Sequence, residues 1–305
     1  NPEDLITDEI KSLLKHPGAL EILDFAEGKI KLVSVYAKKS GILVGRQIKE
    51  LNSDLPDYET RIPALYRDEN LMIPTGDTTI LEGDEVFFIA DEKHIEDVTQ
   101  ELQKLEDKYR NIYVVGAGNI GTSLASKINS DFNLKVIEKD SEQSKIASDL
   151  LDDVLILNAD AADKDFLANE GIAECDVYVA VTQDDETNVL CSLMAKKLGA
   201  KKTITIINND AYFDLVGKNE LDIIISPVQI TVSYILKYIR KGSVSNVHKV
   251  KKGKAEVIEI TIDNFAAGLN GKKISDLEMG DSIEIPCLQR EESVVIAHKE
   301  TELLE

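Results

Sequence analysis

The sequence has little positive charge for its size. Its 305 residues include 35 Lys and Arg but 56 Asp and Glu, which gives a formal net charge of −21. Summed negative charge repels phosphates at long range, so the composition argues against non-specific binding to nucleic acid or to an anionic lipid surface. Any anionic ligand must therefore be bound by a local feature of the chain that offsets the overall negative charge. The chain is nevertheless 43% hydrophobic, which is enough to build cores and excludes wholesale disorder.

Long apolar runs and paired cysteines are also missing. The longest uncharged apolar stretch, residues 223–236, is shorter than the roughly 20 residues of a membrane helix, so we expect a soluble chain. Cys175, Cys191 and Cys287 are odd in number and widely spaced, which fits neither a disulfide framework nor a C-x-x-C motif. No charged-then-apolar leader opens the sequence. We therefore expect no secretion and a reducing cytoplasm.

An internal repeat organises the chain. Residues 45–51 match residues 271–277 at a constant offset of 226, and similar amphipathic helices follow Asn1-Pro2 and Ser226-Pro227. The alternating segments Ile30–Tyr36 and Val257–Ile262 predict strands in each copy, and Glu92–Gln103 predicts a helix. A β-rich module without a catalytic constellation is the preferred interpretation of both copies. The length is one full period plus a remainder, so we expect part of a longer tandem protein.

A different pattern lies between the copies. Short apolar runs that predict strands alternate there with helical stretches such as Ile120–Ile128 and Glu186–Leu198. The strand-like runs are Ile112–Val115, Lys135–Ile137, Val154–Leu157, Val177–Val181, Thr203–Ile207 and Ile223–Ile225. Nearly all-apolar strands that alternate with helices indicate a parallel sheet covered on both faces. The predicted fold class is α/β, with a doubly wound nucleotide-binding sheet and smaller α+β lobes on either side.

A glycine-rich turn follows the first of these strands. Residues 116–121 read Gly-Ala-Gly-Asn-Ile-Gly and open a predicted helix. In this motif Gly116 permits a tight turn, Gly118 lets the backbone approach a phosphate, and Gly121 lets helix and strand pack closely. Free amides at the start of the helix supply the positive end that a chain of charge −21 otherwise lacks. We interpret the turn as a phosphate site; the alternative is a glycine turn that binds nothing.

Side chains after the next strands complete a candidate nucleotide site. Glu138 ends the second strand, where a carboxylate accepts from ribose hydroxyls and repels a 2′-phosphate, which disfavours NADP; Lys139 beside it weakens this effect a little. Asp160 and Ala161 follow the third strand, where the adenine is expected, and Thr182 follows the fourth. The acids after Thr182, Asp184 and Asp185, are more typical of helix capping than of metal ligation or a subunit contact.

Catalytic groups are missing from this region. The four histidines are His16, His94, His248 and His298, and none falls between residues 108 and 226. No tyrosine has a lysine four residues later, so the pair used by short-chain dehydrogenases is absent. Hydride transfer needs a positioned acid or base. Binding without turnover is therefore the better hypothesis, and we expect neither catalytic residues nor a metal site.

The order of these motifs resembles the TrkA family, the cytosolic regulatory subunits of Trk-type potassium uptake systems, which are built from RCK domains. The resemblance covers nearly the whole chain. It rests on the glycine turn, Val136-Ile137-Glu138-Lys139-Asp140, Ala180-Val181-Thr182, and Asp222 to Pro227 with its following helix. The sequence departs from the family at Asn158, where glycine is usual, and at Asn208-Asn209, where an arginine is often near.

The resemblance implies a domain plan. It predicts the helical end of a first RCK unit at 1–29, a first RCK_C (TrkA-C) lobe at 30–106, an RCK_N (TrkA-N) nucleotide-binding domain at 107–226, a crossover helix and linker at 227–253, and an incomplete second RCK_C lobe at 254–305. The residues expected to contact nucleotide are Gly116, Ala117, Gly118, Asn119, Ile120, Gly121, Glu138, Lys139, Asp160, Ala161 and Thr182.

The resemblance also implies a function. Family members form dimers or rings, dock on the cytoplasmic face of a membrane-embedded potassium-translocating subunit, and respond to NAD or NADH, or alternatively to ATP and ADP. An apolar stripe at helical spacing supports either cover of the chain's own sheet or contact with a partner: Val228, Val232, Ile235, Leu236 and Ile239. Three alternatives stay open, namely an NAD-dependent dehydrogenase, a regulator of another potassium channel or antiporter, and a scaffold with a vestigial glycine turn.

Overall fold

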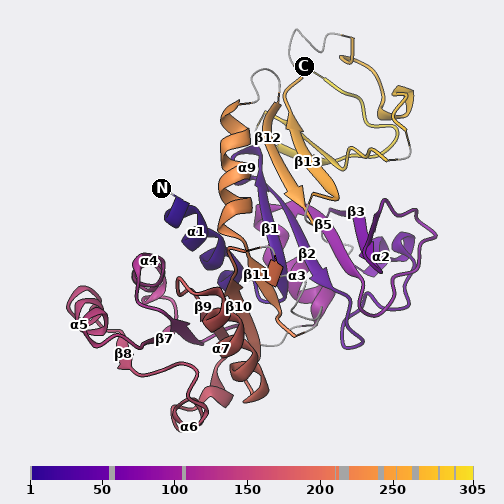
Figure 1. Ribbon diagram of the computed structural model, residues 1–305. Coiled ribbons are helices and arrows are strands. Elements are labelled where there is room, and N and C mark those ends of the chain that lie inside the picture. Colours follow the sequence, from indigo (N-terminus) through magenta and orange to yellow (C-terminus); the bar gives the residue numbers. More distant parts are fainter. Residues whose placement is uncertain are drawn as a thin grey trace. The chain divides into compact units, whose positions relative to one another are not determined.

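The computed structural model describes residues 2–54, 59–104, 108–209, 211–212, 220–239, 244–251, 253–262, 268–280, 282–291 and 293–304. The chain folds into two compact units (Figure 1). The first comprises Asn1–Lys15 and Asp107–Val232, and the second comprises His16–Glu106 and Ser233–Glu305. Each unit therefore combines segments that are far apart in the sequence.

A parallel six-stranded sheet forms the centre of the first unit. Its strands are β6 (Asn111–Val115), β7 (Asn133–Glu138), β8 (Leu155–Asn158), β9 (Val177–Ala180), β10 (Lys202–Ile206) and β11 (Ile223–Ile225). They lie in the order β11-β10-β9-β6-β7-β8, and every neighbouring pair is parallel. The order reverses between β6 and β9, so the crevice at their carboxyl ends is the switch point where such sheets bind ligands.

Six α-helices whose bounds lie within the described residues belong to this unit or begin in it. They are α1 (Pro2–Lys15), α4 (Asn119–Ile128), α5 (Ser141–Leu150), α6 (Lys164–Asn169), α7 (Asp185–Lys197) and α9 (Pro227–Ile239), which continues into the second unit. Aspartates cap three of them because Asp140, Asp163 and Asp184 accept from backbone N–H groups of the first turn. The α/β fold class and the predicted strands are confirmed, with ends displaced by one or two residues.

An antiparallel sheet dominates the second unit. Its strands are β1 (Ala19–Phe25), β2 (Ile30–Tyr36), β3 (Thr60–Arg67), β4 (Asn70–Met72) and β5 (Glu85–Asp91), in the order β1-β2-β5-β3-β4. The helices α2 (Ile48–Asp54) and α3 (Ile95–Gln103) accompany it. The predicted helix Glu92–Gln103 begins as a separate 3-10 turn at Glu92–His94, because Asp91 accepts from the N–H of Lys93 before α3 starts.

Two hairpins complete the second unit. They are β12 (Val244–Val250) with β13 (Ala255–Ile260), and β14 (Cys287–Arg290) with β15 (Ser293–Ile296). Residues of both hairpins share a core with one face of the five-stranded sheet. The fully or largely buried members of this core are Phe25, Ala26, Ile30, Leu32, Phe87, Ile89, Val250 and Ile296. The two small β-rich segments of the sequence therefore pack on each other within one unit.

The repeat in the sequence has a counterpart in the hairpin turns. The turn between β1 and β2 places Ala26 at φ 52° and Gly28 at φ 90°, and the turn between β12 and β13 places Lys251 at φ 50° and Gly253 at φ 79°. Both turns use the left-handed region at corresponding positions. Positive φ is common in tight hairpin turns, so this agreement is compatible with the internal repeat and adds little to the sequence match.

Candidate nucleotide-binding site

The turn after β6 has a backbone that only glycine fits well. Gly116 lies at φ 97°, and a Cβ atom there would stand 3.1 Å from the backbone N and Cα of Thr182, which follows β9. A side chain would therefore be strained by its own backbone and crowded by its neighbour. Gly116 lets the chain turn directly over the switch point between β6 and β9.

Gly121 has a different reason to be glycine. A Cβ atom on it would lie 1.8 Å from the carbonyl oxygen of Gly116, far inside any contact distance. The first turn of α4 thus packs directly against the turn that precedes it. Gly118 contrasts with both, since it has φ −71° as the N-cap of α4, and no atom within 4 Å would meet a Cβ there.

Open space at Gly118 coincides with the positive end of a helix. The N–H groups of the first turn of a helix have no acceptor within the helix and point outwards. No side chain caps α4, because Gly118 has none to offer. Asn119 is exposed and Ile120 is partly buried, so this turn faces solvent. The arrangement is suited to a phosphate group, which helix N-termini bind through backbone amides and the helix dipole.

Glu138 connects the end of β7 to this turn. Its Oε2 accepts from the N–H of Ala117 at 2.7 Å, and its Oε1 accepts from the N–H of Asp140 at 2.8 Å. Gln143 donates from Nε2 to the carbonyl oxygen of Ala117 at 2.6 Å. The carboxylate and the amide together fix the orientation of the second residue of the glycine turn. Glu138 therefore has a structural task, and its two oxygens keep further acceptor positions.

The loop after β8 is tied to the end of β7. Asn158 donates from Nδ2 to the carbonyl oxygens of Glu138 and Lys139, at 3.0 and 3.1 Å. These two bonds connect the ends of β7 and β8 through the Asn158 side chain. Lys139 forms an ion pair with Asp160 at 2.7 Å, and this hydrogen bond, with one from the N–H of Ala162, lowers the pKa of Asp160. Ala161 is buried in the core beneath.

Thr182 and its neighbours close the other side of the switch point. The hydroxyl and N–H of Thr182 both donate to Oδ1 of Asn188, at 2.6 and 2.9 Å, and Asn188 is fully buried. Asp184 caps α7 through the N–H of Thr187, which lowers its pKa, as the capping interpretation predicted. Asp185 accepts from the backbone N–H groups of Asn208 and Asn209. These acids are occupied by the protein itself.

The predicted site residues thus lie along one edge of the sheet. The glycine turn follows β6, Glu138 and Lys139 end β7, Asp160 and Ala161 follow β8, and Thr182 follows β9. Direct contacts join Ala117 with Glu138, and Lys139 with Asp160. Ala161 contributes packing, because its side chain lies in the core. No group of three or more His, Cys, Asp or Glu able to hold a metal ion occurs among the described residues.

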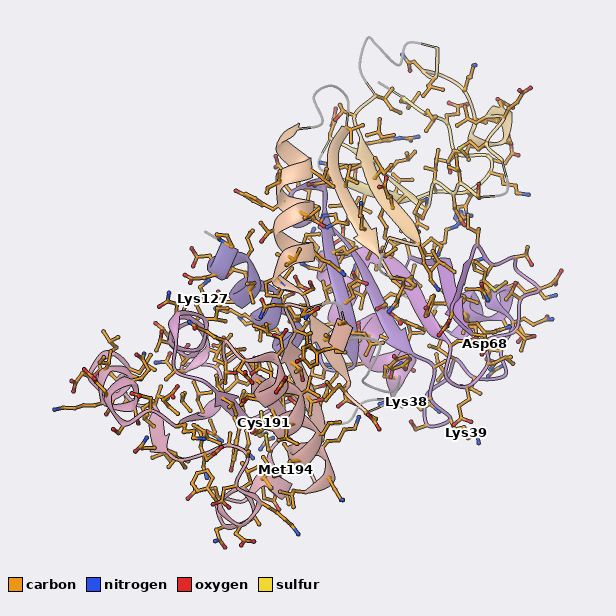
Figure 2. The ribbon with its side chains drawn as sticks, in the orientation of Figure 1. Lys38, Lys39, Asp68, Lys127, Cys191 and Met194 are labelled. Atoms are coloured by element: carbon orange, nitrogen blue, oxygen red, sulfur yellow. The ribbon has the colours of Figure 1, made fainter. Side chains whose placement is uncertain are left out.

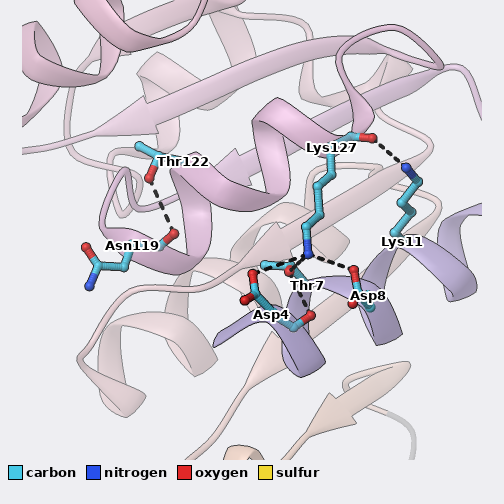
Figure 3. A network of polar contacts seen from close by, with 7 residues as sticks. All are labelled: Asp4, Thr7, Asp8, Lys11, Asn119, Thr122 and Lys127. Atoms are coloured by element: carbon cyan, nitrogen blue, oxygen red, sulfur yellow. Dashed lines mark hydrogen bonds and ion pairs between the residues drawn. The ribbon is translucent and has the colours of Figure 1, made fainter. Parts of the chain in front are cut away.

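Helix α1 packs against the helix that carries the glycine turn (Figure 3). Lys127 of α4 donates to Thr7 Oγ1 and Asp8 Oδ1, both at 2.7 Å, and also pairs with Asp4 at 3.6 Å. Lys11 donates to the carbonyl oxygen of Lys127 at 2.9 Å. These contacts attach α1 to α4.

Sequence reasoning missed two contacts of this site. Gln143 stands three residues after the N-cap Asp140, the position of a capping-box glutamine, but its side chain donates to the carbonyl oxygen of Ala117 and not to the N-cap, so the motif did not signal this contact. Asn119 donates from Nδ2 to Oε1 of Glu3 at 2.9 Å. These residues are 116 positions apart in the sequence, and no local pattern connects them.

The fold and the site together define a class of protein. A doubly wound parallel sheet with this strand order, a glycine turn at the switch point and an acid at the end of the second strand is a Rossmann-type nucleotide-binding unit. Comparison with known families agrees. The TrkA-N domain matches residues 112–227, and the TrkA-C domain matches residues 32–103.

Relatives extend the match over nearly the whole chain. The Trk system potassium uptake protein TrkA of Halomonas elongata is 41% identical over 300 residues, which are 98% of this chain and 66% of the relative. The proteins of the same name from Vibrio alginolyticus and Haemophilus influenzae are 39% and 37% identical over 302 residues, with the same coverage. The chain belongs to the TrkA family. It spans 66% of the length of these relatives, somewhat less than two thirds.

Solved structures show the same fold at low identity. A crystal structure of the GsuK RCK domain is 16% identical, with a TM-score of 0.56, and the match covers 100% of this chain and 65% of that chain. A GsuK channel bound to NAD is 15% identical with a TM-score of 0.55, over 100% of this chain and 54% of that chain. At such identity the likeness shows the fold.

Proposed function

We propose that this chain is a nucleotide-binding regulatory subunit that gates a Trk-type potassium transporter without catalysing a reaction. One observation carries the proposal. The glycine turn leaves open space at Gly118, beside the unpaired amides of a helix N-terminus, at the switch point of the sheet. The chain also belongs to a family whose relatives are named potassium uptake proteins.

Different residues of the site would bind different parts of an adenine nucleotide. Backbone N–H groups of Gly118, Asn119 and Ile120 would hold the phosphates, because they are the free donors of α4. Glu138 would accept from ribose hydroxyls with the acceptor positions that Ala117 and Asp140 leave open.

The ion pair of Lys139 with Asp160 would border the adenine, next to Ala161. Thr182 would stand on the far side of Gly116.

The cofactor proposed first is NAD or NADH, with ATP or ADP as the alternative. All of them present the same adenosine half, so Gly118 and Glu138 serve either. The carboxylate of Glu138 favours a free ribose over a 2′-phosphate, which argues against NADP. A solved GsuK channel with the same fold is described as bound to NAD. The NAD bound to that channel supports NAD as the first choice of cofactor.

Absence of turnover is part of the proposal. Hydride transfer between a nicotinamide and a substrate needs a positioned acid or base. The sequence from residue 108 to residue 226 contains no histidine. The missing histidine argues against an NAD-dependent dehydrogenase, which is the second candidate. Oxidation of NADH by the purified protein with small carbonyl compounds would favour it, and binding of NADH without oxidation favours a sensor.

A partner in the membrane completes the proposal. No helix in the part of the chain that the structure describes has both the length and the apolar character to cross a bilayer. The subunit would therefore reach the membrane by docking on the cytoplasmic side of a potassium-translocating protein. Assembly into a dimer or ring would use α9, on which Val228, Val232 and Ile235 are 54%, 41% and 46% exposed at helical spacing. Ile239 of the predicted stripe has no described side chain.

Gating requires that the nucleotide distinguish two arrangements of the assembly. A ligand shifts an equilibrium only by its difference in affinity for the two states. A difference of about 1.4 kcal/mol shifts the equilibrium tenfold. A direct test is potassium flux through a reconstituted Trk-type transporter with this subunit, measured with and without NADH or ATP. Flux that responds to nucleotide in the wild type, and not with Gly118→Asp, supports the proposal; flux indifferent to both contradicts it.

A further inference from the structure

Four hydrogen bonds form a closed ring beside the glycine turn. Glu138 accepts from the N–H of Ala117 at 2.7 Å and from the N–H of Asp140 at 2.8 Å. Asp140 in turn accepts from the N–H of Gln143 at 2.8 Å, and Gln143 donates from Nε2 to the carbonyl oxygen of Ala117 at 2.6 Å. This hydrogen-bond ring connects the end of β7, the first turn of α5 and the glycine turn.

The hydrogen-bond ring fixes Gln143 at both ends of its side chain. The backbone of Gln143 belongs to the first turn of α5, which Asp140 caps. The far end of the side chain bonds to Ala117, which is fully buried. A buried carbonyl oxygen needs a hydrogen-bond partner within the protein, and Gln143 supplies it. Gln143 therefore keeps the carbonyl group of Ala117 in one direction.

The peptide bond between Ala117 and Gly118 connects this contact with the phosphate site. The described residues contain no cis peptide bond, and in a trans peptide the C=O and N–H groups point in opposite directions. Because the carbonyl of Ala117 faces Gln143, the N–H of Gly118 faces away from Gln143. This N–H has no acceptor among the residues that the structure describes. It is therefore a free donor at the N-terminus of α4, which Gly118 caps.

Glycine makes this peptide easy to turn over. Half a turn of the peptide plane would exchange the directions of the two groups and bring φ of Gly118 from −71° into the left-handed region. Glycine enters that region at little cost, whereas other residues avoid it. The turned peptide would present the carbonyl oxygen of Ala117, an acceptor, where a phosphate needs a donor. Something outside Gly118 must therefore hold the peptide in its binding orientation.

We propose that Gln143 is a positioning residue for a nucleotide phosphate, because its hydrogen bond keeps the N–H of Gly118 directed away from α5 before the ligand arrives. The inference rests on the proposed nucleotide-binding function and names the residue that prepares one of its donors. A donor that is fixed in advance needs no reordering on binding, which raises affinity. Gln143 acts only through the peptide of Ala117, so it should leave recognition of adenine and ribose unchanged.

This role predicts a loss of affinity that depends on phosphate. Gln143→Met keeps the length of the side chain and suits a helix, but it cannot donate a hydrogen bond. Loss of one prepared hydrogen bond to a charged group should weaken ADP binding by at least about tenfold. ADP is the probe because NAD and ATP both contain it. Adenosine has no phosphate, so its binding should be the same in the wild type and in Gln143→Met.

Two methods on the intact protein measure these effects. Calorimetry gives the affinity for ADP, and NMR on protein with isotope-labelled glycine follows ADP and adenosine through the glycine amides. The signal of Gly118 is identified by its absence from Gly118→Ala. At saturation, ADP should shift the amide proton of Gly118 downfield in the wild type, because the amide then bonds to phosphate. The shift should be smaller in Gln143→Met, where the peptide is free to turn.

Gln100→Met is the matched control. Gln100 lies on α3 in the second unit and also donates from Nε2, to Glu96 at 3.1 Å. The same substitution therefore removes a side-chain hydrogen bond from a helix that is not part of the nucleotide site. Gln100→Met should bind ADP and adenosine as the wild type does.

The outcomes separate this inference from the proposed function. A loss for ADP alone, with Gln100→Met like the wild type, supports the role of Gln143. Equal ADP affinity in the wild type and Gln143→Met overturns that role and leaves nucleotide binding in place. An equal loss for ADP and adenosine also overturns it, because the effect is then a general one on the fold. Wild-type protein that binds neither ADP nor NADH contradicts the proposed function, and the inference with it.

Discussion

A Cβ atom on Gly121 would lie 1.8 Å from the carbonyl oxygen of Gly116, whereas one on Gly118 would meet nothing within 4 Å. Two glycines of one turn therefore have separate tasks. Gly121 lets α4 pack against the turn, which is a matter of stability. Gly118 keeps the space in front of the helix open, where we propose that a phosphate binds.

The two tasks can be separated by alanine substitutions. Gly121→Ala should lower the free energy of unfolding by at least about 2 kcal/mol, because the backbone must move to admit the methyl group. Gly118→Ala should change stability by less than about 0.5 kcal/mol, since φ there suits any residue. Urea unfolding measures both. Equal losses in the two variants would show that the turn does not pack as described.

Gly118→Ala should weaken nucleotide binding although it leaves stability almost unchanged. The methyl group of Gly118→Ala would occupy the space that a phosphate needs, so we expect at least about tenfold weaker binding of NADH, or about 1.4 kcal/mol. Affinity is measured by calorimetry on the folded variant. Unchanged affinity would mean that the phosphate does not approach Gly118.

Lys127→Met tests the attachment of α1 to α4. Lys127 is 28% exposed and contacts Thr7, Asp8 and Asp4. Removing its ammonium should cost about 1–2 kcal/mol, because the hydroxyl of the buried Thr7 loses a charged partner as well. Lys15→Met, which breaks a more exposed pair with Asp131, is the matched control and should cost about 0.5 kcal/mol or less. Equal unfolding transitions for the two variants would contradict the network in Figure 3.

Asp176 gives a stabilisation that depends on pH. Burial acts to raise the pKa of Asp176, but hydrogen bonds from Lys201 and from the N–H groups of Asn111 and Arg110 outweigh it and lower the pKa. The stabilisation is therefore present above the ordinary pKa of 3.8 and is lost as the pH falls through the lower value in the folded protein.

The prediction for Asp176 follows from that sign. Asp176→Asn should be less stable than the wild type at pH 7 by about 2 kcal/mol, since hydrogen bonds to a charged group are lost. The difference should shrink as the pH falls below 4. Urea unfolding at a series of pH values checks it. A difference that is constant from pH 7 to pH 3 would show that the charge of Asp176 is not what matters.

Two of the three cysteines, Cys175 and Cys191, should be unreactive in the folded protein. Cys175 and Cys191 are fully buried, and burial raises the pKa of each to about 12 (Cys191 is labelled in Figure 2). Thiolates are the reactive form, so iodoacetamide at pH 8 should leave both unmodified until the protein unfolds. Cys287 is partly exposed and should be modified first. Mass spectrometry of timed samples would reveal early labelling of Cys191, which would contradict the packing of α7 on the sheet.

Much of the first unit could be predicted because its signals are local. Runs such as Val177–Val181 are apolar throughout, which is typical of a strand buried on both faces. The glycine turn is recognisable because its three glycines stand at fixed spacing between a strand and a helix that follow each other directly in the sequence. Asp184 was correctly interpreted as a cap for the same reason, since its partner Thr187 is three residues away.

Contacts between distant segments were beyond sequence reasoning. Nothing in the sequence pairs Lys127 with Asp8, or Asn119 with Glu3, because these contacts depend on where the helices lie after folding. The structural role of Glu138 was also missed. A carboxylate at a strand end is typical of ribose recognition, but its bond to the N–H of Ala117 follows from the path of the glycine turn.

Calorimetric titration of the intact protein tests the central claim most directly. NADH, NAD, ADP and ATP would each be titrated into one preparation, and into Gly118→Asp and Gly268→Asp. Both variants add a negative charge at a glycine with open surroundings, but only Gly118 begins α4. The account predicts saturable binding of at least one nucleotide by the wild type and by Gly268→Asp, and its loss in Gly118→Asp. Binding of no nucleotide by the folded wild type, or equal binding by both variants, would contradict it.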